Sequence, residues 1–478
     1  MKKEKIGQML LTTSLTIDND EITALNQGAF FYGGDTGFDF ENGNRAQQWL
    51  RKSAKKQGVA GEALTRCAGM ARQIGEAVAK DAPAVGQLYQ PTICVSTDVR
   101  WGRTYECSGS NVELVSALSV MVDGIQSAGL AATVKHYVGD GSAHSVGAVK
   151  MHENGYLLSN VLRKACPVRP VLESWFTPTR ATCSLKETKD MSVALDQVDN
   201  LAFCGYVTTD YNAITDNQGT PLQQMRNAIA AGNDMLMVPE PQQAAATLAT
   251  VTKLICEDGA AAERCDSACI PEARINEAVR NVLMTKAQLG LLQAPWPLKA
   301  ETCGFPAKVL GVERVGSSDN AQNEETKKLA LLAAERSQVL LKNVKGTLPL
   351  DKDQIKTVLL LGTAADDVGR LCGGWTINWQ GDQAFRQDGI TVAGALQGMG
   401  LKIITGIKEA TAAATVDGPE SVVTLIVASE LPYAEYLGDS MTPTLPEDDL
   451  TDVASACTEA SPWRCVVVVA AGRPLDIP

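Results

Sequence analysis

Histidine is scarce in this chain, and cysteine occurs without the spacing that metal or redox motifs need. Three histidines are present, His136, His144 and His152, which is too few for a histidine-rich metal site. The thirteen cysteines are an odd number and include no C-x-x-C pair, so in a chain of this length they predict neither a disulfide framework nor a zinc knuckle. We therefore predict buried thiols for most cysteines, no structural metal and no cofactor.

Positive charge and long apolar runs are also in short supply. The chain has 43 basic and 55 acidic residues, and its net charge of −12 would repel phosphate backbones and anionic membrane surfaces. The opening MKKEKIGQMLLTTSLTIDND has only a short apolar part, which is typical of neither a signal peptide nor a membrane span. The sequence predicts a soluble chain that binds no nucleic acid and no membrane, and it does not indicate an oligomeric state.

Hydrophobic residues make up 45% of the 478, which is too much chain for one ordinary core and predicts two domains. In residues 1–292, short β-rich runs are separated by longer stretches with helical spacing. This alternation predicts parallel strands joined by helical crossovers. The runs are GAFFYGG, VGQLYQPTICV, LAATVKHYVGDG, FCGYVTTD and NDMLMVP. The last helix of this domain is RINEAVRNVLMTKAQLGLL, whose apolar residues share one face.

Residues 293–323 carry prolines and no sustained period, which is typical of a linker between domains. Residues 324–478 form the second predicted domain. It starts with the helix NEETKKLALLAAERSQVLLKN and continues with the apolar runs TVLLLGTA, LKIITGI, SVVTLIVAS and CVVVVAAG. Nearly continuous valine, leucine and isoleucine predicts strands covered on both faces, and therefore a layered α/β domain.

Polar residues stand where several of these runs end. Asp210 ends the run FCGYVTTD, Lys135, His136 and Asp140 follow LAATV, and Arg103 lies on a neighbouring segment. Because the C-terminal ends of parallel strands share one binding edge, we expect acid, base and hydrogen-bonding groups to gather there. Taken alone, an aspartate after a strand is more often the N-cap of the next helix.

A series of motifs favours the functional interpretation. The motifs are RWGRTYE (100–106), KHYVGDG (135–141), GYVTTDY (205–211), AGNDMLMVP (231–239), SQVLLKN (337–343), CGGWTINWQGD (372–382), ELPYAEYLGD (430–439) and GRPL (472–475). Each motif alone is a weak signal, but the ordered series over most of the chain is specific. It closely resembles the β-glucosidase and exo-β-glucanase branch of glycoside hydrolase family 3.

This resemblance implies a TIM-like (β/α) barrel followed by a six-stranded α/β sandwich, with the active site between them. It implies a retaining, exo-acting β-glycosidase that removes nonreducing-end glucose from β-glucosides or β-glucans by double displacement. The partner is therefore a β-linked glucoside or oligosaccharide. Asp210 matches the family's nucleophile at the end of the G-[FY]-V-x-[ST]-D strand, and Glu435 matches the acid/base that follows P-Y-x.

The same matching implies a set of sugar-binding residues, with two tryptophans flanking the second subsite. The set is Arg103, Lys135, His136, Asp140, Tyr211, Trp375 and Trp379. Without the resemblance, other interpretations stay open. The two tryptophans, four residues apart, would pack a helix, and Lys135 with His136 would form a satisfied core pair. Glu435 would be a solvated acid in an acidic tract.

The chemistry needs two carboxyl groups that titrate differently. In a retaining glycosidase they lie roughly 5 to 5.5 Å apart, one attacking the anomeric carbon and the other protonating the departing oxygen. We expect nearby cations, with Lys135 and Arg103 as candidates, to hold Asp210 ionised, and a less polar setting to keep Glu435 protonated. After the glycosyl-enzyme forms, Glu435 would take a proton from water and the ester to Asp210 would be hydrolysed.

The chain also departs from the family pattern. The G-x-D-x-x-H-G type segment, whose aspartate grips sugar hydroxyls in the family, has no match between residues 34 and 76, and the stretch after KHYVGDG skips a helix and a strand. Five runs read as strands before the linker, whereas a closed parallel barrel needs about eight. We expect an incomplete barrel with an open edge, although insertions such as VLESWFTP are candidate replacement strands. The sandwich also stops early, which indicates missing exons, a fragmentary gene model or a decayed copy.

Two other functions stay open at this stage. A β-N-acetylhexosaminidase of the same family would use a loop histidine as proton donor, for which His144 is the candidate, although the motif PYAE argues against it. Alternatively, the chain is an inactive carbohydrate-binding remnant. Relatives in the family are often secreted or periplasmic, and this chain begins inside the motif EKIGQM, so we expect an upstream leader to have been lost.

Overall fold

The computed structural model describes residues 2–13, 29–31, 61–81, 86–96, 98–136, 140, 171–174, 205–216, 219–238, 240–256, 269–289, 291–292, 324–344, 346–376, 378–381, 389–458 and 463–477. These residues fall into two compact units. The first unit contains the described residues of 2–96 and 106–337. The second contains residues 98–105 together with the described residues of 338–477, so a short segment from early in the chain packs with the C-terminal part.

Parallel strands form the centre of the first unit. They are β1 (Leu10–Thr13), β2 (Ala29–Phe31), β3 (Gln87–Leu88), β4 (Ala131–Val134), β5 (Val171–Ser174), β6 (Tyr206–Thr209) and β7 (Leu236–Met237). Their order is β2-β1-β7 and β3-β4-β5-β6, with every pair parallel. A parallel bridge between Thr208 and Met235 joins β6 to the start of β7, so the two series form one continuous set.

All five runs predicted as strands in this domain are confirmed by strands β2, β3, β4, β6 and β7. The structure adds two that the run count omitted, β1 and β5. The β5 strand is the VLES of the insertion VLESWFTP, and its register pairs Val171 with Thr133 on one side and with Tyr206 on the other. The insertion therefore does supply a replacement strand between β4 and β6.

This set of strands bends strongly. The Tyr206 hydroxyl on β6 donates a hydrogen bond to Gln87 Oε1 on β3 at 2.6 Å, although β4 and β5 lie between those strands in the pairing order. One apolar cluster also joins Leu11 of β1 and Met237 of β7 with Tyr89, which directly follows β3. Side chains on this face therefore meet across an enclosed interior, as happens when a sheet curls.

Helices surround these strands, with two further short strands beside them. The helices are α1 (Lys2–Gln8), α4 (Gly61–Lys80), α5 (Val112–Leu118), α6 (Met121–Ser127), α10 (Pro221–Ala230), α11 (Pro241–Leu254), α12 (Glu272–Gln288) and α13 (Glu324–Ser337), and the short strands are β8 (Ile255–Cys256) and β9 (Ile270–Pro271). Local sequence explains individual ends. The α10 helix begins at a capping box in which Thr220 and Gln223 satisfy each other's backbone amides, with Pro221 in the first turn.

The predicted helix RINEAVRNVLMTKAQLGLL is confirmed as α12. Ile275, Val282 and Leu289 on its predicted apolar face are buried, and Val279 packs partly buried against the main cluster. The predicted helix NEETKKLALLAAERSQVLLKN is shorter than expected, because α13 ends at Ser337. Asn343 instead exchanges two side-chain hydrogen bonds with the backbone of Leu348, at 3.0 and 2.8 Å, and such local bonds compete with helix formation.

A partly buried lysine links α12 to α1. Lys286 donates a hydrogen bond to Gln8 Oε1 at 2.9 Å, and burial lowers the pKa of Lys286 from 10.5 to about 8. The unfolded chain therefore binds more protons than the folded chain between about pH 8 and 10.5. The sign of this difference means that Lys286 lowers stability below pH 8 and that the penalty disappears as pH rises through this window.

We expect Lys286→Met to raise the free energy of unfolding by about 2 kcal/mol at pH 7, since removing the partly buried charge outweighs the lost hydrogen bond. The advantage over wild type should shrink as the pH rises from 8 towards 10.5. Urea denaturation of both proteins at several pH values measures it. Lys253→Met on the exposed side of α11 is the matched control. A gain in unfolding free energy that is the same at pH 7 and pH 10 would contradict the lowered pKa of Lys286.

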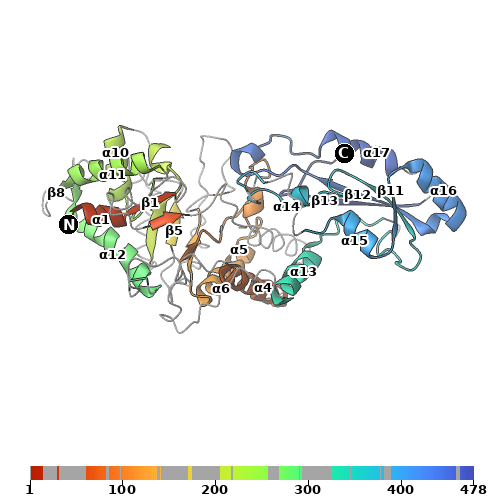
Figure 1. Ribbon diagram of the computed structural model, residues 1–478, viewed down its shortest axis with the longest axis horizontal. Helices are drawn as coiled ribbons and strands as arrows, with labels where there is room; N and C mark the ends of the chain where they lie inside the picture. Colours follow the sequence, from red (N-terminus) through yellow and green to blue (C-terminus); the bar gives the residue numbers. More distant parts are fainter. Residues whose placement is uncertain are drawn as a thin grey trace. The chain divides into compact units, whose positions relative to one another are not determined.

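The second unit is a parallel sheet between helices. Its strands are β10 (Thr357–Leu361), β11 (Lys402–Ile404), β12 (Val422–Ser429) and β13 (Arg464–Ala470), in the order β11-β10-β12-β13. Its helices are α14 (Val368–Cys372), α15 (Val392–Gly398), α16 (Ile407–Asp417) and α17 (Glu447–Ala456), shown in cyan and blue in Figure 1. Val358 and Leu360 pack with α15 on one face, whereas Leu359 packs with α16 on the other.

The four predicted apolar runs of this domain are confirmed, and β10 and β12 are covered on both faces as expected. The β13 strand differs, because Val467 and Val468 are 39% and 36% exposed. It is an edge strand, and within the described residues no further strand pairs with its outer side. A valine-rich sequence is therefore not sufficient evidence that a strand is covered on both faces.

The cysteine prediction is wrong for six residues. The structure contains the disulfides Cys94–Cys107, Cys256–Cys269 and Cys457–Cys465, whereas Cys372 is a buried thiol. Each bonded pair is close in sequence, with separations of 13, 13 and 8 residues, so each closes a short local loop. The expectation rested on the absence of C-x-x-C spacing and on the odd number of cysteines. Disulfides that close short local loops require neither C-x-x-C spacing nor an even number of cysteines. None of the helices in the described part of the chain is long and apolar enough to cross a membrane.

Candidate active site

The first unit carries one group of predicted site residues at the C-terminal ends of two of its strands. Lys135 and His136 directly follow β4, and Asp210 directly follows β6. The intervening β5 is parallel to both, so all three residues lie at the same edge. The expectation that these residues would meet at one edge is therefore met for Asp210 and His136, whose side chains approach each other.

His136 is held between two carboxylates. Its Nδ1 lies 2.6 Å from Asp140 Oδ2, and its backbone amide donates to the same oxygen at 3.1 Å. On the opposite side of the ring, Nε2 lies 3.8 Å from Asp210 Oδ2. The imidazole is 2% exposed and the carboxylate of Asp210 is 14% exposed, so this approach takes place in a mostly buried setting. Asp140 thus orients the ring, and the ring presents its other nitrogen to Asp210.

Hydrogen bonds to β7 fix the backbone on both sides of Asp210. Thr209 donates its amide to Met235 O at 3.0 Å, and its hydroxyl accepts from Met237 N at 2.8 Å. The amide of Asn212 donates to Met237 O at 3.2 Å. The following 3-10 turn starts at Ala213, so Asp210 lies too early to cap it. The N-cap interpretation of Asp210 therefore does not describe this structure.

A buried acid that the sequence analysis left without a role supports the same strand ends. Asp234 accepts from Val207 N at 3.0 Å and from Arg274 at 2.9 Å, and the amide of Asn281 donates to it at 3.3 Å. Burial raises the pKa of Asp234, while the charge of Arg274 and these hydrogen bonds oppose that rise. The available signal was an acid within the apolar run NDMLMVP, which predicts a buried, paired carboxylate.

The second unit carries the other group of predicted residues. Glu435 begins a short 3-10 turn, Glu435–Gly438, after β12, and its backbone has a positive φ of 53°. Arg103 Nη1 donates to Glu435 Oε1 at 3.3 Å, and the same guanidinium lies 5.9 Å from the ring centre of Trp375. The structure thus brings Arg103, Glu435 and Trp375 together, although they come from three distant segments.

The setting of Glu435 differs from the expected one. A less polar environment was predicted, but the carboxylate is 24% exposed and hydrogen bonded by a guanidinium that is only 4% exposed. A cation at this distance favours the charged form of a carboxylate. Arg103 was also a candidate cation for Asp210, and its Nη1 donates to Glu435 here. Glu435 therefore has a specific partner and is not simply a solvated acid of the acidic tract.

The tryptophans lie on a turn, not on a helix. The α14 helix ends at Cys372, and Trp375 N donates to Trp379 O at 3.0 Å across the turn. Gly374 packs so closely on the backbone of Tyr433 that a Cβ at this position would overlap the Tyr433 carbonyl. Trp379 meets Tyr436 edge to face, with ring centres 5.8 Å apart. Both tryptophan rings are half-buried, which agrees with the loop interpretation over the helix-packing one.

Of the remaining predicted residues, Tyr211 and Lys135 are described by the structure, and His144 is not. Tyr211 is 56% exposed beside Asp210, where its amide donates to Asp210 Oδ1 at 2.5 Å. Lys135 is half-buried at the end of β4. The alternative proton donor His144 lies outside the described residues, as does the predicted linker 293–323. Among the residues that the structure describes, no cluster of three His, Cys, Asp or Glu side chains could hold a metal ion.

Comparison with known families matches both halves of the chain. Residues 39–163 match the glycosyl hydrolase family 3 N terminal domain, and residues 338–478 match the glycosyl hydrolase family 3 C-terminal domain. The chain belongs to glycosyl hydrolase family 3. The resemblance found in the motifs is thereby confirmed, and with it a two-domain protein of mixed α/β content.

Curated relatives in glycosyl hydrolase family 3 are similar to this chain over part of their length. A lysosomal beta glucosidase of Dictyostelium discoideum is 26% identical over 362 residues, covering 70% of this chain and 39% of the relative. A periplasmic beta-glucosidase of Salmonella typhimurium is 27% identical over 361 residues, covering 70% of this chain and 42% of the relative. The chain spans about two fifths of the length of these relatives.

Solved structures share the fold. An exo-1,3/1,4-beta-glucanase from a Pseudoalteromonas species matches with a TM-score of 0.73 and 21% identity, covering 100% of this chain and 81% of that one. A beta-glucosidase from Listeria innocua in complex with laminaribiose matches with a TM-score of 0.69 and 19% identity, covering 99% and 69%. At these identities the likeness shows the family 3 fold alone.

Proposed function

We propose that this chain is a retaining, exo-acting β-glycosidase that removes nonreducing-end glucose from β-glucosides or β-glucans. The observation that carries the proposal is the local order around the two carboxylates at the family's motif positions. Asp210 is anchored at the end of β6 and faces His136, with Nε2 at 3.8 Å from Oδ2. Glu435 is held after β12 by Arg103 at 3.3 Å. Asp210 belongs to the first unit and Glu435 to the second, and double displacement needs two carboxyl groups.

In the proposed mechanism, Asp210 is the nucleophile. Its Oδ1 already accepts the Tyr211 amide, and its Oδ2 faces His136, so an attack on the anomeric carbon starts from a carboxylate with a defined orientation. The hydrogen bond between Asp140 and His136 fixes the imidazole that faces Asp210, and so helps to keep the orientation of the Asp210 carboxylate. Lys135, at the end of the neighbouring strand, is proposed to bind sugar hydroxyls beside it.

Glu435 is the proposed acid and base. It protonates the leaving oxygen in the first step and removes a proton from water in the second. Because Arg103 donates to the carboxylate of Glu435, we propose that a sugar hydroxyl takes over this guanidinium when substrate binds. Glu435 then loses the contact that favours its charged form and can carry the proton. Trp375 and Trp379 are proposed to stack on the next sugar unit.

We propose that the first domain is a TIM-like barrel. The continuous parallel order β2-β1-β7-β6-β5-β4-β3 and the contact between Tyr206 and Gln87 across the interior support it. The described part of the chain contributes seven strands to this series and shows no pairing between β2 and β3. Domain boundaries at 1–292, 293–323 and 324–478 are part of this proposal.

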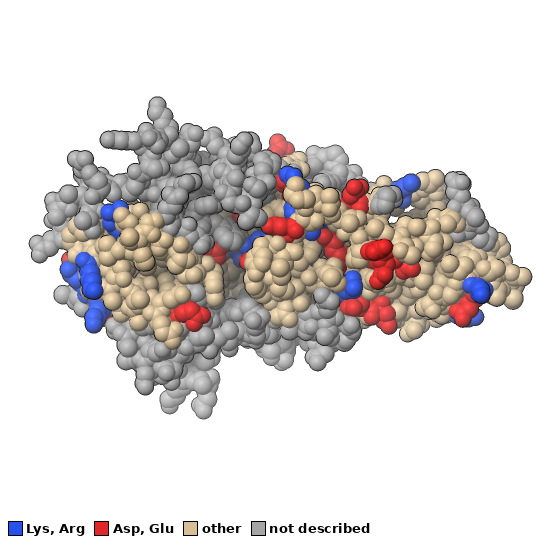
Figure 2. Space-filling view, turned by 90° about the horizontal axis from the view of Figure 1, so that it is seen from above, with Lys and Arg blue, Asp and Glu red and all other residues tan. Residues whose placement is uncertain are grey.

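The proposed substrate and compartment follow from charge and disulfides. On the face in Figure 2, acidic side chains occur at several places with basic ones scattered among them, which suits an uncharged β-linked sugar better than a polyanion. Three disulfides are typical of an oxidising compartment. Together with the periplasmic and lysosomal names of the two relatives, they support a secreted, periplasmic or lumenal location.

Hydrolysis of p-nitrophenyl β-glucoside by the purified chain tests the proposed function. We expect release of p-nitrophenol, with β-glucose as the first sugar product in a proton NMR time course, because two displacements retain the anomeric configuration. The matched substrate p-nitrophenyl N-acetyl-β-glucosaminide should be a poor substrate, which separates this proposal from a β-N-acetylhexosaminidase. Glucose binding without turnover would instead identify the chain as a carbohydrate-binding remnant, and α-glucose as first product would contradict the retaining mechanism.

A further inference from the structure

A buried ion pair with a tyrosine lies in the second unit where β12 and β13 end. Arg473 Nε and Nη2 both contact Glu430 Oε1, at 3.0 and 2.9 Å, and the Tyr433 hydroxyl donates to Glu430 Oε2 at 3.0 Å. The guanidinium also lies over the Tyr433 ring, 4.9 Å from its centre. The side chains of Arg473 and Glu430 are 4% and 10% exposed. A buried pair of this kind is stable only when its other donors and acceptors are satisfied as well.

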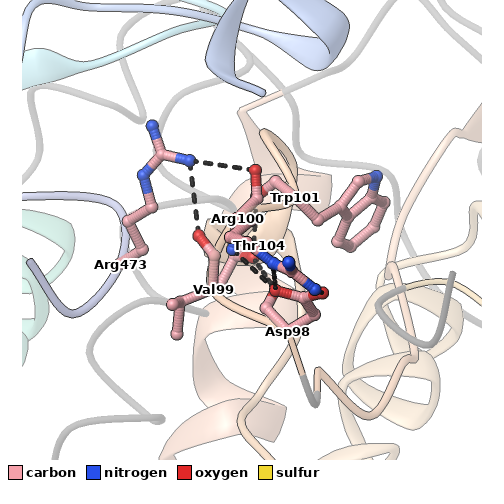
Figure 3. A network of polar contacts seen from close by, with 6 residues as sticks. All are labelled: Asp98, Val99, Arg100, Trp101, Thr104 and Arg473. Atoms are coloured by element: carbon pink, nitrogen blue, oxygen red, sulfur yellow. Dashed lines mark hydrogen bonds and ion pairs between the residues drawn. The ribbon is translucent and has the colours of Figure 1, made fainter. Parts of the chain in front are cut away.

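The remaining nitrogen of Arg473 reaches the segment that carries Arg103. Its Nη1 donates to Val99 O at 3.3 Å and to Arg100 O at 3.4 Å, as Figure 3 shows. This segment is itself folded tightly, because the Thr104 hydroxyl donates to Trp101 O at 2.7 Å and also lies 3.0 Å from Asp98 O. One guanidinium therefore joins the carboxylate that follows β12 to two carbonyls of the 98–105 segment.

The same segment also bonds to the turn that begins at Glu435. Gly102 N donates to Asp439 Oδ1 at 2.8 Å, and Ser440 N donates to Arg100 O at 3.0 Å. A Cβ at Gly102 would overlap the carbonyl of Glu435, so the two backbones touch. Arg103 and Glu435 are thus carried by two loops that are fastened to each other, with Arg473 bonded to the first of them.

Tyr433 fills the space between these loops and Arg473. Its ring packs against Gly438, where a Cβ would overlap ring atoms, and it meets Tyr105 edge to face at 5.8 Å. Its hydroxyl is 3.0 Å from the place where a Cβ on Gly472 would lie. Two residues further along, Glu435 adopts φ of 53°, a conformation that non-glycine residues keep only where the surroundings fix it.

We propose that Arg473 is a positioning residue that holds the acid/base Glu435 and its partner Arg103 at fixed positions relative to each other. It acts through Glu430 and Tyr433 on one side and through the carbonyls of Val99 and Arg100 on the other. This inference rests on the proposed function, in which Glu435 donates a proton to the leaving oxygen. Arg473 itself touches neither carboxylate oxygen of Glu435 in the contacts above. Its effect is to keep the two loops that carry the reacting groups from shifting, and small shifts of an acid catalyst cost large factors in rate.

The test compares two aryl β-glucosides that differ in their need for a proton. Phenol is a poor leaving group and needs Glu435, whereas 2,4-dinitrophenol leaves without acid help. For Arg473→Lys, which keeps the charge but loses the fork, we expect kcat/KM on phenyl β-glucoside to fall about 30- to 100-fold and kcat/KM on the dinitrophenyl substrate to change less than about threefold. Tyr433→Phe, which removes a single hydroxyl, should show the same selectivity with a loss of about three- to tenfold.

Arg464→Lys, at the opposite end of β13, is the matched control and should leave both substrates unchanged. Equal losses on the two substrates for Arg473→Lys would show a general structural role and overturn the inference, as would no loss on either. If Arg473→Lys does not fold, the selectivity of Tyr433→Phe decides by the same criterion.

Hydrogen exchange provides a readout that does not depend on turnover. Peptides covering residues 98–105 and 435–440 should exchange faster in Tyr433→Phe and Arg473→Lys than in wild type, while the peptide covering α16 should not change. Unchanged exchange in both peptides would overturn the inference. A wild-type chain that hydrolyses neither substrate overturns the proposed function, and exchange then decides alone whether Arg473 orders these loops.

Discussion

Asp210→Asn should abolish hydrolysis of aryl β-glucosides, with kcat falling by about four orders of magnitude or more. An amide of nearly the same shape keeps the contacts to Tyr211 and His136 but cannot form the glycosyl ester. The loss should be equally severe with phenyl and 2,4-dinitrophenyl β-glucoside, because the nucleophile acts whatever the leaving group. Steady-state kinetics on both substrates measures it.

The control for this substitution is Glu113→Gln, which makes the same chemical change at an exposed position on α5 and should leave kcat unaltered. A second variant identifies the role more sharply. Asp210→Ala leaves space for azide beside the anomeric carbon, and azide attack on the β-glucoside should then give the α-glucosyl azide. Residual turnover of Asp210→Asn within tenfold of wild type would show that another residue is the nucleophile.

Glu435→Ala should separate good from poor leaving groups. We expect kcat/KM on phenyl β-glucoside to fall about 10²- to 10⁴-fold, the usual contribution of a positioned general acid, and kcat/KM on 2,4-dinitrophenyl β-glucoside to stay within about tenfold of wild type. The first step then proceeds without a proton donor, but hydrolysis of the glycosyl-enzyme is slow because no general base activates the water. A burst of dinitrophenol followed by slow turnover is the expected time course.

Azide should accelerate the slow phase of Glu435→Ala and give the β-glucosyl azide, the opposite anomer to that from Asp210→Ala. The pair of azide products therefore assigns the two roles independently of rate. Glu447→Ala, an exposed acid in the first turn of α17, is the control from the same acidic tract. Equal losses on the two leaving groups would remove Glu435 from the proton-transfer step.

The fold was predictable from the sequence where apolar runs are long or are bounded by polar residues. Strands β6, β10 and β12 fall within their predicted runs, because buried strands in parallel sheets need unbroken apolar sequence, and β13 begins one residue before its run. The short β1 and β5 were not counted, since four residues such as LLTT or VLES carry too little periodicity to identify a strand. Pairing to neighbours on both sides is what makes them strands, and that information is not local.

The candidate site was predictable in its membership but not in its contacts. Motif order selected Asp210, His136, Arg103 and Glu435, yet Glu435, the partner of Arg103, lies 332 positions further along the chain. A guanidinium can serve either a carboxylate or a sugar hydroxyl, and residue type alone does not decide between them. The three disulfides were missed for a similar reason, because pairing is a matter of which loops close in space.

The grouping of residues 98–105 with the C-terminal half limits how this protein can be divided into fragments. A piece that starts near residue 338 would contain Arg473 and Asp439 but none of the carbonyls and amides that they bind in the 98–105 segment. Conversely, an N-terminal piece would present that segment, which lies between the bonded Cys94 and Cys107, without the Arg473 and Asp439 that it contacts here. A truncation between the two halves therefore separates the 98–105 segment from Arg473 and Asp439, although the cut itself lies far from these residues in the sequence.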